Sequence, residues 1–240
     1  MTVINVARTA VTVETQGAGA APYLLLHGGA GPGSMRPLAG LLAARGGTHV
    51  VVPTHPGFAG TPRPAGLNGI PALAGLYAAL LERLGLRDVT VVGNSIGGWV
   101  AAELALLGDP RITEVVLVNA VGADVPGQPI TDISTLTPVE LAELAFHDPS
   151  HGPSGPHRPG ADLAALAAYT RMSMTDPGLR DRLADLKLPV HVVWGASDGI
   201  VSPAYGRALA DAIPGARFTL LADTGHLPQL EAPERLLAVL

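Results

Sequence analysis

Two kinds of hydrophobic pattern follow one another near the start of the chain. Residues 9–17 alternate polar and apolar side chains, which predicts a strand with one exposed face. Residues 23–26 are apolar without a break, as in a strand buried on both faces. Further runs that predict strands lie at residues 48–53, 88–93, 112–120, 189–195 and 216–221. Apolar residues at helical spacing separate them, at residues 35–46, 69–85, 95–108, 203–213 and from 232 onwards.

Short strands that alternate with helices predict an α/β fold with a mostly parallel sheet that helices cover on both faces. The alternation stops near Gly122, where a Pro-, Gly- and Ser-rich segment with several helical stretches begins, and it resumes near residue 188. We therefore expect one core domain made of residues 1–121 and 188–240. Residues 122–187 would be a small helical cap inserted between two strands of the same sheet.

The first helix expected in this insertion has a clear start signal. Thr137 can cap it, Pro138 suits its first turn and Glu140 completes a capping box. Two more helical segments are expected near residues 161–174 and 177–186. The Pro- and Gly-rich residues 150–160 resist regular packing, so we expect them to be mobile. The bulkier apolar residues that could pack the cap or line a pocket beneath it are Phe146, Tyr169, Met172 and Met174.

Composition narrows the classes of function. The chain has 240 residues, of which 48% are hydrophobic and 15% charged, so it can bury a large core. Its net charge of −5 and its single lysine, Lys187, disfavour binding to nucleic acid or anionic membranes. The absence of cysteine excludes disulfides and thiolate chemistry. We see no signal peptide and no membrane-spanning stretch, and therefore expect a soluble, cytoplasmic and, from its Ala-, Gly-, Pro- and Arg-rich composition, bacterial protein.

A Gly-x-Ser-x-Gly motif lies where a predicted strand becomes a helix. Residues 93–97 read GNSIG, with Ser95 at the centre. Glycines allow a turn tight enough to push the serine hydroxyl out of the backbone, and the helix N-terminus places N–H groups beside it. The strand–turn–helix context supports a nucleophile elbow rather than a plain glycine-rich connection.

A serine nucleophile needs a base that an acid orients, and in this type of fold the chain order is Ser, acid, His. Asp198 follows one of the resuming strands and His226 follows the next. Carboxyl ends of parallel strands gather at one edge, so both could reach Ser95. Asp124, after an earlier strand, and Asp223, three residues before His226, are rival acids.

The segment HGGAGPGS at residues 27–34 follows an early strand and exposes bare backbone. Such a loop can donate N–H groups to an oxyanion, together with the N–H of Ile96 directly after the serine. Gly29 is our first choice of loop donor and Ala30 the second, while His27 is read as a brace for the loop rather than a second base. The histidines show no metal-ligand spacing and no phosphate-loop pattern occurs, so we expect neither metal nor cofactor.

Five segments, in this order, resemble the α/β-hydrolase fold superfamily over essentially the whole chain. They are LLLHGGAGPGS, PTHPGFAGTPRP, VVGNSIGGWVA, VVWGASDGIVSP and LLADTGHLPQLEAPE. The resemblance implies Ser95 as nucleophile, Asp198 as acid and His226 as base, with an oxyanion hole from Gly29 and Ile96. A serine at the elbow argues against dehalogenases and epoxide hydrolases, which resemble this fold but carry aspartate there.

The residues GNSIGG and HGGAGPG are also similar to carbon–carbon bond hydrolases of aromatic degradation. That group has an aromatic residue after its catalytic histidine and an arginine after the Trp-Gly of the acid strand, where this chain has Leu227 and Ala196. The leading hypothesis is therefore a cofactor-free serine hydrolase of small to medium carboxylic esters. The alternatives are a carbon–carbon hydrolase or lactonase on the same triad, or a ligand sensor that signals through its cap. The oligomeric state stays open.

Overall fold

Eight strands form one sheet in the order β1-β2-β4-β3-β5-β6-β9-β10. The computed structural model describes residues 1–152, 160–171 and 173–240. Strands β1 and β2 pair antiparallel, β2 pairs antiparallel with β4, and every pair from β4 to β10 is parallel. The strands are β1 (Thr2–Val6), β2 (Thr9–Gly17), β3 (Ala21–Leu26), β4 (Thr48–Pro53), β5 (Val89–Asn94), β6 (Ile112–Val118), β9 (Val190–Gly195) and β10 (Arg217–Leu221).

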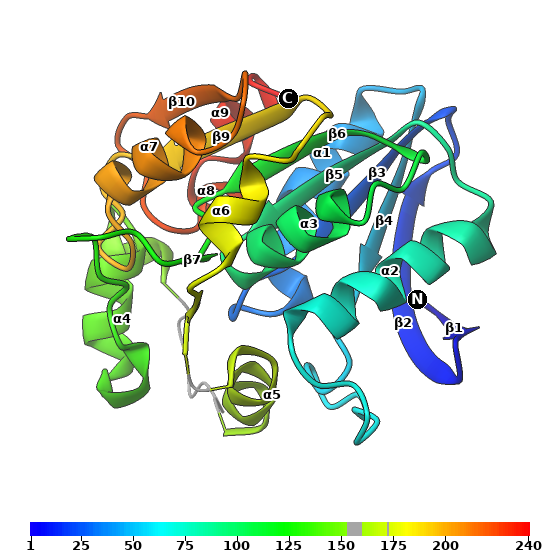
Figure 1. Cartoon of the computed structure of the whole chain (residues 1–240), viewed down its shortest axis with the longest axis horizontal. Coiled ribbons are helices and arrows are strands. Elements are labelled where there is room, and N and C mark those ends of the chain that lie inside the picture. The colour runs from blue at the N-terminus through cyan, green and yellow to red at the C-terminus, as the bar shows by residue number, and fades with distance from the viewer. Residues whose placement is uncertain (153–159, 172) are drawn as a thin grey trace.

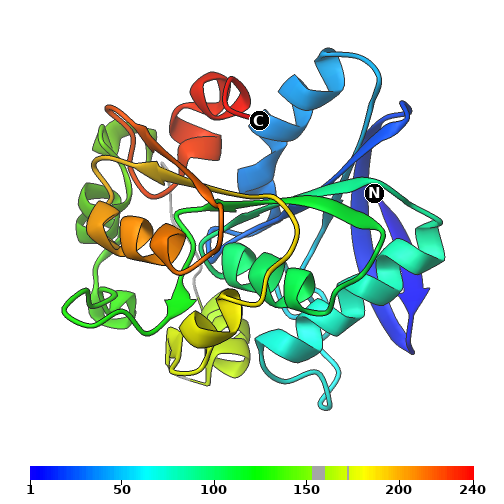
Figure 2. The ribbon, with the colours of Figure 1, turned by 45° about the horizontal axis from the view of Figure 1, so that its top comes forward.

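Helices cover both faces of this sheet, as the sequence predicts (Figures 1 and 2). Neighbouring residues of one strand belong to two different apolar clusters, one on each face of the sheet. Val91 of β5 packs with residues of α2 and α3, whereas Val92 packs with residues of α1 and α9. This alternation explains why consecutive residues in the middle of the central strands, such as Val91 and Val92, are both apolar. The helices of the core are α1 (Arg36–Ala44), α2 (Ile70–Leu84), α3 (Ile96–Leu106), α7 (Pro203–Asp211), α8 (Pro228–Glu231) and α9 (Pro233–Leu237).

The insertion between β6 and β9 contains the predicted helices and also a small sheet. Thr137 caps α4 through the expected box with Glu140. Two strands of two residues each, which the sequence does not predict, pair in parallel. A strand this short leaves no periodic signal, since period two needs about four residues to be recognised. The elements are β7 (Gly122–Ala123), α4 (Pro138–Ala145), α5 (Gly160–Thr170), β8 (Thr175–Asp176) and α6 (Leu179–Leu183).

A partly buried ion cluster ties the end of the insertion to the core. Arg182 of α6 donates to both carboxylate oxygens of Glu103 on α3, each at 2.7 Å, and to Asp176 of β8 at 2.6 Å. Glu103 is only 5% exposed, so this bidentate contact supplies the partner that a buried carboxylate needs. The two carboxylates raise the pKa of Arg182 above its usual range.

Two sequence-based expectations on the insertion reach beyond the part of the chain that the structure describes. The predicted mobility of residues 150–160 falls mainly on residues 153–159, which lie outside it. Met172, in the second predicted segment at residues 161–174, also lies outside it. Within the described residues, no helix has the length and apolarity that crossing a bilayer requires.

Candidate active site

Ser95 occupies the turn between β5 and α3 with a strained backbone. Its φ of 56° and ψ of −120° lie in a region that residues other than glycine rarely adopt. The neighbouring glycines are needed for space: an added Cβ would lie 2.1 Å from the Gly97 oxygen at Gly93, and 2.2 Å from the Leu26 oxygen at Gly97. The sequence GNSIGG therefore folds into the predicted sharp turn, and the strain falls on Ser95.

His226 and Asp198 form a buried pair at the carboxyl edge of the sheet. His226 Nδ1 lies 2.8 Å from Asp198 Oδ2, and both residues are 6% exposed. The other oxygen, Asp198 Oδ1, accepts from the backbone N–H groups of Ile200 at 2.8 Å and Val201 at 3.0 Å. These contacts fix the carboxylate, and they leave Nε2 as the ring nitrogen that is free to act as a base.

The pair is tied to the serine through Asn94. The Asn94 amide donates to the carbonyl oxygen of His226 at 2.9 Å, and Asn94 Oδ1 accepts from the Gln229 amide at 3.0 Å. Among the described residues, no hydrogen bond joins Ser95 Oγ to the His226 ring. Such catalytic bonds are often long without substrate and tighten when it binds.

The rival acids lie elsewhere. Asp124 is exposed in the loop after β7, and Asp223 is exposed and within 3.8 Å of His147. Only Asp198, of the three, hydrogen-bonds to His226 in the described part of the chain. The catalytic roles of Ser95, Asp198 and His226 stay predictions, and this geometry is their physical support.

The expected oxyanion donors are the backbone N–H of Gly29, in the loop after β3, and that of Ile96, at the start of α3. Gly28 packs against the serine, because a Cβ added there would lie 2.8 Å from Ser95 Cβ. Within the described residues, neither the N–H of Gly29 nor that of Ile96 has a protein acceptor. Both are therefore free to donate to a substrate oxygen, as predicted, although the role itself stays a prediction.

Two buried histidines, His27 and His55, support the glycine loop through a network of hydrogen bonds. The backbone N–H of His55 donates to His27 Nε2 at 3.0 Å, so His27 carries its proton on Nδ1 and donates it to the Gly28 oxygen at 2.7 Å. His55 Nε2 donates to the His27 oxygen at 2.7 Å, and its Nδ1 accepts from the Tyr77 hydroxyl. We assigned these tautomers from the network. Every ring nitrogen is thereby used with both rings neutral.

Burial lowers the pKa of His27 to about 4 and holds that of His55 well below its usual value. This agrees with the reading of His27 as a brace, since a neutral ring with both nitrogens occupied cannot act on substrate. Sequence reasoning left His55 without a role. The one sequence feature that could have pointed to a role for His55 is its position two residues after the buried strand β4.

The insertion also supports the loops that carry Asp198 and His226. The last carbonyls of α4 accept from them: the Leu144 oxygen from the Gly199 N–H at 2.9 Å, and the Ala145 oxygen from the His226 N–H at 2.7 Å. On the opposite side, Leu166 of α5 lies over the glycine loop, with its Cδ2 3.8 Å from an added Cβ at Gly29. α4 and α5 therefore flank the edge of the sheet at which Ser95 lies.

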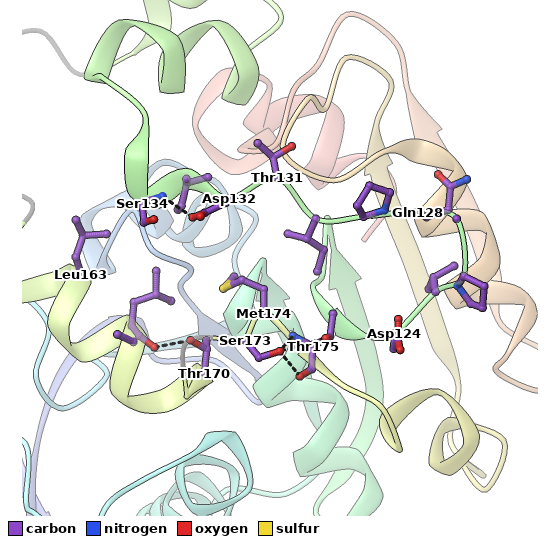
Figure 3. Close-up of a pocket in the computed structure, with 18 of the residues that line it drawn as sticks. Asp124, Gln128, Thr131, Asp132, Ser134, Leu163, Thr170, Ser173, Met174 and Thr175 are labelled. Atoms are coloured by element: carbon purple, nitrogen blue, oxygen red, sulfur yellow. Dashed lines mark hydrogen bonds between the residues drawn. The ribbon is translucent and has the colours of Figure 1, made fainter.

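A cavity of about 950 Å³ lies between α5 and the loop that follows β7 (Figure 3). Leu166, which lies over Gly29, is part of its wall, whereas Ser95, Asp198 and His226 are not among the described residues that line it. Its lining is largely apolar and includes Asp124, Asp132, Ile130, Ile133, Leu163, Ala167 and Met174. Lysine and arginine do not occur among the described lining residues.

Of the bulky residues expected to line a pocket, Met172 lies outside the described residues, and among the other three only Met174 lines this cavity. Phe146 packs with Ile200 and Leu227 instead, and the Tyr169 hydroxyl donates to the Pro56 oxygen at 2.7 Å. Nowhere in the described residues do three His, Asp or Glu side chains gather in a way that could hold a metal ion.

Two curated proteins are similar to this chain over most of its length. The chain is 30% identical over 243 residues to a 2-hydroxymuconate semialdehyde hydrolase of Pseudomonas putida, covering 89% of this chain and 83% of that protein. It is 31% identical over 200 residues to the dihydrolipoyllysine-residue acetyltransferase component of an acetoin cleaving system of Cupriavidus necator, but spans only 49% of that protein's length and 71% of its own.

Among solved structures, a thermophilic esterase from Thermogutta terrifontis superposes with a TM-score of 0.77 at 26% identity, covering 99% of this chain and 95% of that one. The model of the alpha/beta hydrolase family matches residues 23–239. These matches support a hydrolase activity in general terms. With its serine elbow and the buried His–Asp pair on one edge of a mostly parallel sheet, the chain belongs to the alpha/beta hydrolase family.

Proposed function

We propose that the protein is a serine hydrolase that cleaves carboxylic esters through an acyl-enzyme on Ser95. The observation that carries this proposal is the buried contact of 2.8 Å between His226 Nδ1 and Asp198 Oδ2, anchored to the strained elbow through Asn94. This arrangement supplies a base with a fixed tautomer beside an alcohol nucleophile. The likeness to the Thermogutta esterase adds support.

In the proposed reaction, Ser95 Oγ attacks the ester carbonyl carbon while its proton passes to His226 Nε2. The carbonyl oxygen becomes an oxyanion, which accepts from the N–H groups of Gly29 and Ile96. The tetrahedral intermediate collapses, the carbon–oxygen bond to the alcohol breaks, and His226 returns the proton to the leaving alkoxide. Water then attacks the acyl-enzyme with His226 as base, and the carboxylic acid leaves with Ser95 restored.

We further propose that residues 122–187 form a cap whose cavity takes the acyl or alcohol group. The cavity is largely apolar, so each buried methylene contributes about 1 kcal/mol to binding. We expect kcat/KM to rise from acetyl to about butyryl or hexanoyl esters and to fall for longer chains. A preference for long-chain lipids would contradict this part of the proposal.

The similarity to a 2-hydroxymuconate semialdehyde hydrolase favours carbon–carbon bond hydrolysis as a second candidate. The charge of the cavity argues against substrates of this anionic kind, because its described lining has Asp124 and Asp132 but no cationic side chain. Cleavage of a dienone substrate in preference to any ester would make this second candidate the better one.

The direct test is labelling with a fluorophosphonate, run beside a panel of chromogenic esters. Only Ser95 should be modified, and Ser95→Ala should lose labelling and lower kcat by at least about 10³-fold. An unchanged melting temperature in Ser95→Ala would show that the loss is chemical rather than structural. Ester turnover near the wild-type rate in this variant would rule out the proposal. Binding of an ester-like ligand without turnover in the wild type would point instead to a ligand sensor.

A further inference from the structure

Asn119 places a third polar side chain at the His226–Asp198 pair. It directly follows β6, is fully buried, and has a φ of 47°. Its amide nitrogen lies 2.7 Å from Asp198 Oδ2, the same oxygen that contacts His226 Nδ1 at 2.8 Å. Its own oxygen accepts from the Gly195 N–H at 3.4 Å. Asn119 therefore links the ends of β6 and β9 through the carboxylate.

The Asp198 carboxylate thus receives four hydrogen bonds, two on each oxygen. Ile200 and Val201 donate to Oδ1 from the backbone, while Asn119 and His226 donate to Oδ2. Three of these donors are neutral and fixed by the fold. They prevent rotation of the carboxylate, and they stabilise its negative charge without competing for the proton of the imidazole.

Few residue types suit the position of Asn119. A positive φ in the left-handed region favours glycine, asparagine and aspartate. Glycine has no donor, and aspartate would place a second negative charge beside the first. Asparagine alone combines the backbone conformation with a neutral donor that reaches the carboxylate.

We infer that Asn119 is a positioning residue that holds the Asp198 carboxylate oriented toward His226 in the proposed hydrolase. The inference rests on the proposed function, because it assumes that Asp198 and His226 act on a substrate. Asn119 does not itself touch the reacting atoms. Its effect should therefore be seen in the pH dependence of catalysis rather than in substrate binding.

Other titratable groups lie on segments next to the pair: His147 and His151 are about half exposed, whereas the Glu231 side chain is buried. His147, after α4, lies 2.9 Å from the Ser197 hydroxyl and 3.8 Å from Asp223. Glu231 of α8 accepts from the Gly225 N–H at 2.7 Å and lies 3.8 Å from His151. His151 also lies 3.9 Å from Asp148. Because His147 is the nearest of the histidines to Asp198 in this network, its His147→Gln variant should be profiled in parallel.

The test compares Asn119→Gly and Asn119→Asp with the wild type in the pH profile of kcat/KM for one ester. Both substitutions keep a residue that tolerates the observed φ, and both remove the donor. Without this donor, His226 is the one side chain that still donates to Asp198 Oδ2 among the described residues, which favours the protonated enzyme, so the acid limb should move to higher pH by about one unit in Asn119→Gly. It should move further in Asn119→Asp, because a second carboxylate favours proton uptake by the cluster.

We expect kcat at neutral pH to fall about tenfold in both variants, with KM within about twofold of the wild type. Tyr205→Phe is the matched control. It removes a buried hydroxyl that bonds to the N–H and the oxygen of Ala123 near the same edge, but it does not touch Asp198. Its melting temperature should fall while its acid limb stays in place.

An acid limb that stays at the wild-type pH in both Asn119 variants would overturn the inference, whatever their stability. If neither variant folds, the side-chain amide signal of Asn119 in the ¹⁵N-labelled wild-type protein should shift with the acid limb. An amide signal that is insensitive to pH across that limb would equally overturn it. Ser95→Ala separates the two proposals: full activity there removes the proposed function, whereas an inactive Ser95→Ala with unmoved Asn119 profiles removes only the inference.

Discussion

The side-chain amide of Asn94 donates to the carbonyl oxygen of His226 at 2.9 Å, so the residue before Ser95 fixes the backbone of the residue proposed as base. The contact joins two loops that are 132 residues apart in the chain. Gln229 completes it by donating to Asn94 Oδ1 at 3.0 Å. The distance between nucleophile and base thus depends on one buried amide.

Asn94→Ala should lower both stability and turnover. It removes the tie to His226 and leaves the buried Gln229 amide without its acceptor, at a cost of about 2 kcal/mol in the free energy of unfolding. Urea denaturation and kcat for a short-chain ester measure the two effects. A double-mutant cycle with Gln229→Leu should be non-additive, since the residues share one network. Additive free energies would show that the Asn94–Gln229 contact carries no stability.

Asp198→Asn should lower kcat/KM by at least about 10³-fold. Because Oδ1 accepts from two backbone N–H groups, the substituted amide must turn its NH₂ toward His226 Nδ1, which then cannot donate. The ring is driven into the tautomer with the proton on Nε2, where it cannot act as a base. Asp124→Asn, in the exposed loop of the cavity, should stay within a few-fold of the wild type. A larger loss of kcat/KM in Asp124→Asn than in Asp198→Asn would show that Asp124 is the acid.

Substitution by alanine should slow the labelling of Ser95 strongly at Gly28 but only slightly at the adjacent Gly29. A methyl group at Gly28 would lie 2.8 Å from Ser95 Cβ and 3.0 Å from Asn94 Oδ1, so the elbow must shift. At Gly29 it would meet only Leu166, at an ordinary 3.8 Å. We therefore expect Gly28→Ala to slow fluorophosphonate labelling of Ser95 by about tenfold or more, whereas Gly29→Ala changes it by a few-fold at most. Equal labelling rates would contradict the packing of Gly28 against the serine.

The buried histidines should make the protein acid-labile. The pKa of His27 is about 4 in the folded state, against 6.5 when exposed, so the unfolded chain binds more protons between these values. Stability is therefore fully present above pH 6.5 and is lost as the pH falls toward 4, by on the order of 3 kcal/mol. His55, whose pKa is also lowered, acts in the same direction.

Melting temperatures from pH 7.5 to 4.5 measure this loss. The melting temperature should depend less steeply on pH in His27→Gln than in the wild type. This variant is less stable at neutral pH, because its network with His55 is broken. His49→Gln, a substitution on β4 outside the network, should keep the wild-type slope. A slope that is the same in all three proteins would assign the acid lability to other groups.

Local pattern alone determined most of the fold. Continuous apolar runs such as that of β3 predict strands buried on both faces, because no polar side chain interrupts either surface. Gly85 predicts the end of α2 for an equally local reason: it adopts a φ of 65° that other residues avoid. The strand β1 escaped prediction because its five residues, TVINV, are short and mostly exposed. β7 and β8 are too short to carry any period.

From the order Ser95, Asp198, His226 and the rule that parallel strands end at one edge, the sequence also predicted that these residues lie at the same edge of the sheet. In the structure Asp198 and His226 are hydrogen-bonded to each other, and the catalytic roles of all three stay predictions. Sequence alone left Asp124 and Asp223 as rivals, since all three carboxylates follow strands. Only the tertiary structure separated them, because hydrogen bonding depends on side-chain direction and on distances of a few tenths of an ångström. For the same reason the roles of Asn94 and Asn119 emerged only from the fold. The function of a buried amide depends on its hydrogen-bond partners, and these lie 132 residues away in the chain for Asn94 and 79 residues away for Asn119.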